Sequence, residues 1–195
     1  MMELVLASNS PVRARLLSAA GIRFTVKAPD VDEAQVKGAM SGAAARQVAI
    51  ALSTLKARCA SADLEGWVIG ADQTLEIDGV MLSKPGEKTA VATQLRLLQG
   101  REHRLHAAVS LARQGRMTWR TCRTARLRMR SLSQDDIAGY VERCGETVRH
   151  SVGGYHFEEE GIHLFDRVVG DYHAILGLPL LPLISALRRF GAIGS

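Results

Sequence analysis

Strands and helices alternate along this chain of 195 residues, which predicts an α/β fold with a mixed, twisted sheet flanked by helices. Short apolar runs bounded by turn residues indicate buried strands, and longer segments with apolar side chains three or four positions apart indicate helices. Two pairs typical of tight turns, Asp78-Gly79 and Gln114-Gly115, indicate hairpins. No repeat, low-complexity stretch or linker divides the sequence, so we expect a single domain over residues 1–195.

The first part of the chain begins with a strand and a capped helix. Residues 4–7 are apolar and predict a buried strand. Ser10 followed by Pro11 predicts a helix start, because serine caps helix N-termini and proline fits the first helical position. Two further elements are expected here, a strand over residues 24–28 and a helix over residues 41–60.

The middle of the chain is rich in strands. Residues 67–71 are apolar and predict a strand with Asp72 at its carboxyl end, where open α/β sheets bind their ligands. The elements expected after it are strands over residues 74–77 and 80–82, a helix over residues 87–98, and strands over residues 105–112 and 117–130.

The last part is expected to begin and end with helices. Ser133 predicts a helix cap, and Asp135 and Asp136 follow it in the first turn, where negative charge is favourable. A strand over residues 162–169 and a closing helix from near Pro179 complete the predicted fold.

Composition sets limits on the class of protein. Hydrophobic residues make up 47% and charged residues 23%, which excludes a disordered or fibrous chain. Three cysteines without a CxxC pair argue against a disulfide framework and favour the reducing cytoplasm. We expect no signal peptide, and no membrane partner because the longest apolar run is short and interrupted by glycine and proline.

The charge is positive and unevenly distributed. Lysine and arginine number 25 against 20 acids, a net charge of +5, which indicates an anionic partner. Eight arginines and no acid occur between His103 and Gln134. Nucleic acid, anionic lipid and nucleotide phosphate all remain possible partners at this point.

Several segments suit phosphate chemistry. The turn from Ser8 to Arg13 opens a helix and can bind an anion, although a capped helix with a solvated arginine has the same pattern. Carboxylates at Glu33 and Asp72 can activate water or hold a divalent cation, and lysines can neutralise phosphates. Hydrolysis of a phosphoanhydride needs this combination, provided that the segments converge in space.

The motifs in series resemble the Maf family of nucleotide pyrophosphatases, from residue 4 to residue 188. They are Ser8-x-Ser10-Pro11-x-Arg13-x-x-Leu16-Leu17, Val31-Asp32-Glu33, Gly70-Ala71-Asp72-Gln73, Lys84-Pro85, Gly170-Asp171-Tyr172 and Gly177-Leu178-Pro179-Leu180.

The resemblance implies a Maf/ITPase-like fold whose nucleotide-binding cleft holds a nucleoside triphosphate and a divalent metal, Mg²⁺ or Mn²⁺. The implied reaction is hydrolysis at the α-phosphorus, giving a nucleoside monophosphate and pyrophosphate, and the implied assembly is a homodimer. The roles implied by position are Asp72 as proton acceptor, Glu33 with Asp72 at the metal, Lys56 and Lys84 as active-site lysines, and Ser8, Ser10 and Arg13 as the phosphate-binding loop.

Three positions differ between subgroups of the family. This chain has Val12, Gln73 and Glu158 where the dTTP/UTP enzymes look like Arg, Thr and Gln and the 7-methyl-GTP enzymes look like Trp, Gln and Glu. Gln73 and Glu158 thus match the second group, and we expect them to recognise the base. Val12 departs from both groups and offers no aromatic face to a cationic methylated purine, so the preferred base stays open.

Two other functions compete with a pyrophosphatase. The arginine-rich segment 104–130 suggests nucleic-acid binding, because Arg126, Arg128 and Arg130 would share one face of a strand. That segment has few aromatic residues for stacking on bases, so nucleic acid is not the partner we expect. A weakly active family member that regulates division is the other alternative, against which the presence of Asp72, Glu33 and both lysines argues.

Overall fold

Seven strands form one mixed sheet in the computed structural model, which describes residues 3–194. The sheet order is β2-β1-β3-β5-β6-β7, with β4 paired to β3. β1 runs parallel to β2 and β3, and the other pairs are antiparallel, which confirms the predicted mixed α/β sheet. The strands are β1 (Leu4–Ala7), β2 (Thr25–Val26), β3 (Trp67–Ile77), β4 (Val80–Leu82), β5 (Glu102–Arg113), β6 (Arg116–Met129) and β7 (Phe165–Val169).

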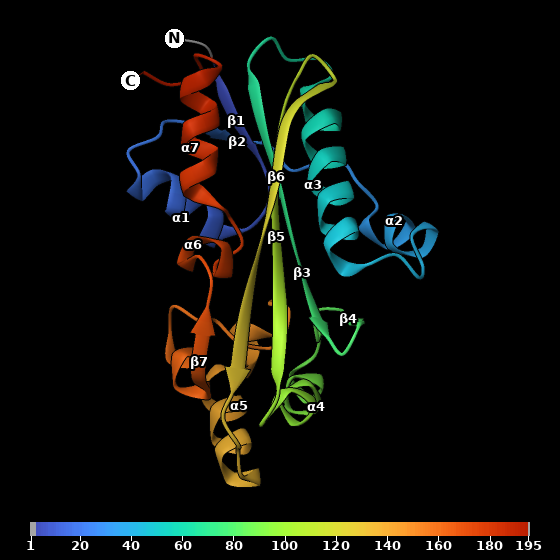
Figure 1. The fold of residues 1–195 in the computed structure, drawn as a ribbon, viewed down its shortest axis with the longest axis vertical. Coiled ribbons are helices and arrows are strands. Elements are labelled where there is room, and N and C mark those ends of the chain that lie inside the picture. The colour runs from blue at the N-terminus through green and yellow to red at the C-terminus, as the bar shows by residue number, and fades with distance from the viewer. Residues whose placement is uncertain (1–2, 195) are drawn as a thin grey trace.

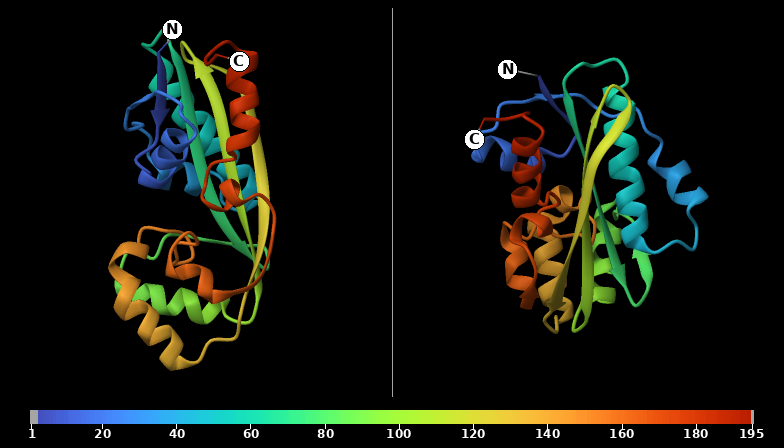
Figure 2. Two further views of the ribbon diagram at one scale, coloured as in Figure 1. Left: turned by 90° about the vertical axis from the view of Figure 1, so that its left-hand side faces the viewer. Right: turned by 45° about the horizontal axis from the view of Figure 1, so that its top comes forward.

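Helices lie on both sides of the long central strands (Figure 1). Figure 2 shows the same arrangement from two other directions, with both chain ends at one end of the sheet. None of the helices within residues 3–194 has the length and hydropathy needed to span a bilayer. The helices are α1 (Pro11–Ala19), α2 (Glu33–Ala39), α3 (Ala45–Ser61), α4 (Lys88–Leu98), α5 (Gln134–Val148), α6 (Tyr172–Ile175) and α7 (Leu180–Arg189), with a 3₁₀ turn η1 (Glu160–Leu164).

Alternation along β3 and β5 separates two faces of the sheet. Ile69 packs with residues of α1 and α7, and Leu75 packs with residues of α4 and α5, so two apolar cores lie on one face. On the other face, Ser110 of β5 contacts the hydroxyl of Ser53 at 3.0 Å, and Thr74 donates to the carbonyl of Ala45. α3 therefore covers the part of the second face that contains Ser110 and Thr74.

Local signals in the sequence correctly predicted several elements. Ser10 caps α1, whose first residue is Pro11. The pair Asp78-Gly79 joins β3 to β4, and both residues have positive φ, as the turn requires. Ser133 and Asp136 form a reciprocal capping box at the start of α5.

The prediction that a strand ends at Asp72 was wrong. β3 is continuous through Ile77, so Asp72 lies in the middle of the strand. Two adjacent polar residues suggested a break in the apolar run, but β5 pairs with β3 from Val68 to Glu76 without interruption. Pairing with a neighbouring strand, which a single sequence does not display, maintains the extended backbone here.

Other boundaries also differ from prediction. No helix was predicted between residues 28 and 41, yet Asp32 caps α2 by accepting from the backbone N–H of Gln35. β2 has only two of the five expected residues, and β6 ends at Met129, one residue before Arg130. Residues 162–164 belong to η1 rather than to β7, and the short helix α6 was not predicted.

Candidate active site

The candidate site lies where the sheet opens beside β3. β1 pairs with β3 as far as Gly70, and β4 begins to pair with β3 only at Leu75. Between these residues one edge of β3 pairs with β5. The opposite edge pairs there with no strand among residues 3–194. Asp72 and Gln73 lie in the gap and, as neighbours on a strand, point to opposite faces of the sheet.

The turn between β1 and α1 forms an anion-binding arrangement next to this gap. Ser10 Oγ accepts from the backbone N–H of Arg13 at 3.4 Å. Ser8 Oγ accepts from the N–H of Ser10 at 3.2 Å and from Arg13 Nη1 at 3.1 Å. Because a helix N-terminus carries positive partial charge and free N–H groups, the turn suits a phosphate.

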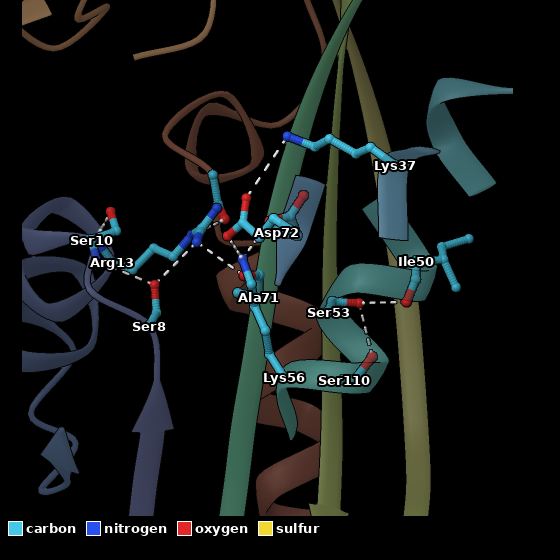
Figure 3. A network of polar contacts seen from close by, with 12 residues as sticks. Ser8, Ser10, Arg13, Lys37, Ile50, Ser53, Lys56, Ala71, Asp72 and Ser110 are labelled. Carbon is cyan, nitrogen blue, oxygen red and sulfur yellow. Dashed lines mark hydrogen bonds and ion pairs between the residues drawn. The ribbon is translucent and has the colours of Figure 1, made fainter. Parts of the chain in front are cut away.

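Arg13 connects three segments of the chain and is not a solvated arginine (Figure 3). Its Nη1 donates to the carbonyl of Ala71 on β3 at 3.0 Å, and its Nε donates to the carbonyl of Gly177 at 2.9 Å. Burial lowers the pKa of Arg13, whereas the charges of Asp72 and Glu33 raise it. A guanidinium stays protonated despite such a change, so Arg13 is a fixed positive charge.

Gly177 is required by this arrangement. Its φ is 90°, in the left-handed region that favours glycine. A Cβ at this position would also lie 3.4 Å from Nε and Nη2 of Arg13. A larger residue would therefore crowd the guanidinium that holds the turn against β3.

Lys56 joins the two candidate catalytic carboxylates. Its Nζ lies 2.6 Å from Asp72 Oδ1 and 2.6 Å from Glu33 Oε1. Figure 3 shows Lys56 extending from α3 to Asp72 on β3. The side chains of Lys56 and Asp72 are 6% and 8% exposed, and that of Glu33 is 38% exposed. A buried lysine thus balances two carboxylates that come from different elements.

Further positive charges surround this pair. Burial raises the pKa of Glu33, but the hydrogen bond and charge of Lys56, with the charges of Lys37 and Lys84, bring it below its ordinary value. Burial lowers the pKa of Lys84, and the neighbouring charge of Arg13 acts in the same direction. Cations placed this close together repel one another, so the site favours binding of a polyanion.

Gln73 and Glu158 present acceptor oxygens. Gln73 Nε2 donates to the carbonyls of Ala174 at 3.0 Å and Ile175 at 2.9 Å, so its Oε1 is the end left for a ligand. Glu158 accepts from Arg15 Nη2 at 3.0 Å, and its side chain is 14% exposed. Both carboxamide and carboxylate are therefore held in place by α1 or by the segment around α6.

All ten site residues chosen from the sequence line one cavity of about 810 Å³. This volume lies within the range typical of small-molecule sites. The ten are Ser8, Ser10, Val12, Arg13, Glu33, Lys56, Asp72, Gln73, Lys84 and Glu158.

The sequence did not reveal the rest of the lining. Lys37, one turn along α2 from Glu33, faces the cavity and lies 3.8 Å from Glu33 Oε2. Leu105, Tyr155 and Leu176 supply apolar surface. Their pattern in the sequence is that of ordinary core residues, so only the fold distinguishes them from the core.

A divalent cation fits the carboxylates, though not as an all-protein cage. No group of three or more His, Cys, Asp and Glu side chains with metal-site geometry occurs in residues 3–194. Glu33 and Asp72 already share one cation, the ammonium of Lys56. Magnesium is commonly bound by one or two carboxylates together with substrate phosphates and water, and this donor set is of that kind.

Comparison with known proteins identifies the family. The family model described as Maf-like protein matches residues 3–190. The chain belongs to this family. A protein of Nitrobacter hamburgensis named nucleoside triphosphate pyrophosphatase is 44% identical to this Maf-like chain over 191 residues, 97% of this chain and 95% of that protein. A protein of Rhizobium meliloti named 7-methyl-GTP pyrophosphatase is 44% identical over 193 residues, 97% of each chain.

A solved structure is more distant from this Maf-like chain. It is described as a nucleoside-triphosphatase, dITP/XTP pyrophosphatase, from Mycobacterium abscessus. The match has a TM-score of 0.40 and 17% identity and covers 66% of this chain and 73% of that one. A likeness at this level carries no argument about the fold or the function.

Proposed function

We propose that this protein hydrolyses a nucleoside triphosphate to a nucleoside monophosphate and pyrophosphate. The observation that carries the proposal is Lys56, held at 2.6 Å from both Asp72 and Glu33, in a cavity that the N-terminus of α1 also lines. The names of the relatives from Nitrobacter hamburgensis and Rhizobium meliloti support it.

In this reaction water attacks the α-phosphorus, a new P–O bond forms, and the bond to the β-phosphate bridging oxygen breaks. Asp72 takes the proton from water, because Lys56 occupies Oδ1 and leaves the other carboxylate oxygen available. Arg13, Lys84 and the turn from Ser8 to Ser10 bind the phosphates and stabilise the negative charge that moves to the leaving pyrophosphate.

Glu33 and Asp72 would hold Mg²⁺ or Mn²⁺ in this proposal. The ion, when bound, neutralises phosphate charge and polarises phosphoryl oxygens. Lys56 separates the same two carboxylates in the absence of substrate and keeps them from repelling one another. Lys37, next to Glu33 on α2, adds a second cation on the outer side.

The acceptors in the cavity favour a base with two neighbouring N–H donors. Gln73 Oε1 and the carboxylate of Glu158 can each accept such a bond. The guanine edge, with a ring N–H and an exocyclic amine, has this pattern. Guanine nucleotides are therefore the substrate class that we propose, and the name of the Rhizobium meliloti relative supports 7-methyl-GTP within this class. Val12 would provide an apolar contact rather than an aromatic stack.

We further propose that the protein acts in the cytoplasm as a homodimer. All three cysteines are free, as is usual in a reducing compartment. β7 ends the sheet, and its outer edge pairs with no strand among residues 3–194. Light scattering of the purified protein tests the dimer, and cell fractionation tests the compartment.

A screen of common, methylated and deaminated triphosphates, with Mg²⁺ or Mn²⁺ and detection of pyrophosphate, tests the activity and the base together. We expect pyrophosphate release, and Asp72→Asn to lower kcat by a factor on the order of 100 or more, since it removes the proton acceptor. Asp63→Asn, an exposed change outside the cavity, is the matched control and should have wild-type activity.

Two results would contradict the proposal. Asp72→Asn with most of the wild-type rate would remove Asp72 from the chemistry. No turnover of any triphosphate with either metal would favour the alternative, a weakly active family member that regulates division.

A further inference from the structure

One face of the sheet is only partly covered. α3 lies along the upper part of β3, β5 and β6 in Figure 1, and the strands continue below it. Thr74 donates to Ala45, the first residue of α3, so coverage by this helix ends near that position. Beyond it, on the same face, Arg104, Arg126 and Arg128 are exposed.

Strand register gathers arginines on this uncovered face. Arg104 of β5 lies directly opposite Arg126 of β6, and Arg128 of β6 lies directly opposite Arg167 of β7. Directly opposite side chains on neighbouring strands have Cβ atoms about 5 Å apart. Arg126 and Arg128 are two residues apart on one strand and therefore also point to the same face. We call these four residues the arginine face.

Acidic side chains balance the arginine face only in part. Glu76 lies 3.4 Å from Arg104, and Glu102 lies opposite Arg128 in the register. The side chains of Arg126, Arg128 and Arg167 form no ion pair and no hydrogen bond with any residue of the described range 3–194. Like charges placed directly opposite destabilise a sheet, so the fold maintains this arrangement at a cost in stability.

The arginine face is separate from the candidate active site. None of its four residues lines the cavity that contains Asp72. Arg13, which lines that cavity, and the arginine face therefore occupy different parts of the surface.

We propose that the arginine face binds the phosphate backbone of a single-stranded nucleic acid, independently of sequence. A protein partner would need an apolar centre, whereas the face has only Val169, 38% exposed, in the same register rows. The major groove of a duplex admits a helix or a two-stranded ribbon, whereas the arginine face spans three neighbouring strands of the sheet. The shortage of aromatic residues that argued against nucleic acid in the sequence excludes stacking on bases, and none occurs in these register rows; contact with phosphates alone does not require them.

Fluorescence anisotropy with a labelled mixed-sequence single strand of about 20 nucleotides tests this proposal. The three arginines that form no ion pair, Arg126, Arg128 and Arg167, predict a slope of about −2 for log K against log[NaCl], since each phosphate contact on a single strand contributes about −0.7. In Arg126→Gln/Arg128→Gln we expect the slope to fall to about −0.7 and the affinity at low salt to fall about tenfold or more.

Arg96→Gln/Arg188→Gln is the matched control, because it removes the same charge and both arginines are exposed on α4 and α7, which pack on the opposite face of the sheet. It should bind the oligonucleotide as the wild type does. Thermal unfolding confirms that both double variants are folded.

Several outcomes would overturn the proposal. One is an equal loss of affinity in both double variants, and another is no binding of the oligonucleotide at low salt. A third is displacement of the oligonucleotide by excess nucleoside triphosphate, which would show that the strand binds in the cavity. Tighter binding of a duplex or of anionic vesicles through Arg126 and Arg128 would assign the face to a different partner. Because neither arginine lines the cavity, the binding result stands or falls separately from the pyrophosphatase activity.

Discussion

Lys56 is the residue on which the candidate site depends most directly. Its side chain and that of Asp72 are almost fully buried, and each is the charge partner of the other. A buried ion pair stabilises the fold little more than apolar packing of the same volume does. Loss of one partner, however, leaves an isolated buried charge and lowers stability strongly. The lysine therefore has a structural as well as a chemical role.

Lys56→Met should lower the free energy of unfolding by about 3 kcal/mol, because it leaves Asp72 buried without a partner. The double variant Lys56→Met/Asp72→Asn should recover part of this loss, since no buried charge remains. Urea denaturation measures both.

Lys37→Met is the control for that experiment. Lys37 also lies near Glu33, at 3.8 Å, but its side chain is 30% exposed. An exposed pair of this kind contributes about 1 kcal/mol or less. Equal stability of the wild type and Lys56→Met would contradict the structural role assigned to Lys56.

At the scale of elements, the cavity is formed by segments that are distant in sequence and tied together by side-chain-to-carbonyl bonds. Arg13 ties α1 to β3 and to Gly177, and Gln73 ties β3 to the carbonyls at the end of α6. The guanidinium can form these bonds simultaneously because its N–H groups are arranged as a rigid fork. A lysine keeps the charge but not this geometry.

Arg13→Lys should therefore lower kcat/KM about thirtyfold, equivalent to about 2 kcal/mol for lost hydrogen bonds of a charged donor. Arg96→Lys is the matched control, because Arg96 is exposed on α4 and does not line the cavity. It should change kcat/KM by no more than about threefold. Similar effects of the two substitutions would show that charge alone matters at position 13.

Elements with a strong local signal could be predicted from the sequence. Ser10-Pro11 fixes the start of α1, and Asp78-Gly79 fixes the turn between β3 and β4. The continuity of β3 through Asp72 could not be predicted, because it results from pairing with β5, which is more than thirty residues away at Ala108. The start of α2 at Glu33 was missed because two adjacent acids resemble a surface loop.

The candidate site was predictable only in its polar part. Motif residues such as Arg13, Lys56 and Asp72 could be chosen from the sequence, and the structure places them in one cavity. That Lys56 contacts both carboxylates, and that Arg13 donates to Gly177, depends on the packing of α3 and of the segment after α6. Spacing along the chain carries no information about such contacts.

At the scale of the whole molecule, one sheet supports two apolar cores with the cavity beside them. His103 belongs to the core formed with α4 and α5, where its Nε2 lies 2.7 Å from the hydroxyl of Tyr155. The ring also lies 5.8 Å from the ring of Phe165. Burial lowers the pKa of His103 to about 4.

This pKa makes stability depend on pH. The unfolded chain binds a proton at His103 below its ordinary pKa of 6.5, whereas the folded protein does not until about 4. The contribution of His103 to stability is therefore fully present above pH 6.5 and lost as the pH falls towards 4, a change of about 3 kcal/mol.

His103→Phe/Tyr155→Phe should remove this part of the dependence, because it replaces both hydrogen-bonding partners by apolar rings. Urea denaturation between the two pH values measures the difference from the wild type. His150→Gln, at an exposed position, is the control and should leave the dependence unchanged. Parallel stability curves for the wild type and the double variant would contradict burial as the cause.

The net charge of +5 has two structural sources. One is the group of cations around Asp72 and Glu33, which suits a triphosphate. The other is the arginine face on the far part of the sheet. The two can be separated by substitution, because Arg126 and Arg128 do not line the cavity.

The central claim, that the cavity cleaves the bond between the α- and β-phosphates by attack of water on the α-phosphorus, is tested most directly by isotope labelling. Hydrolysis is run in water enriched in ¹⁸O, and the products are analysed by mass spectrometry. We expect the label in the nucleoside monophosphate and unlabelled pyrophosphate as the other product. Label in pyrophosphate, or release of orthophosphate with a nucleoside diphosphate, would contradict the claim.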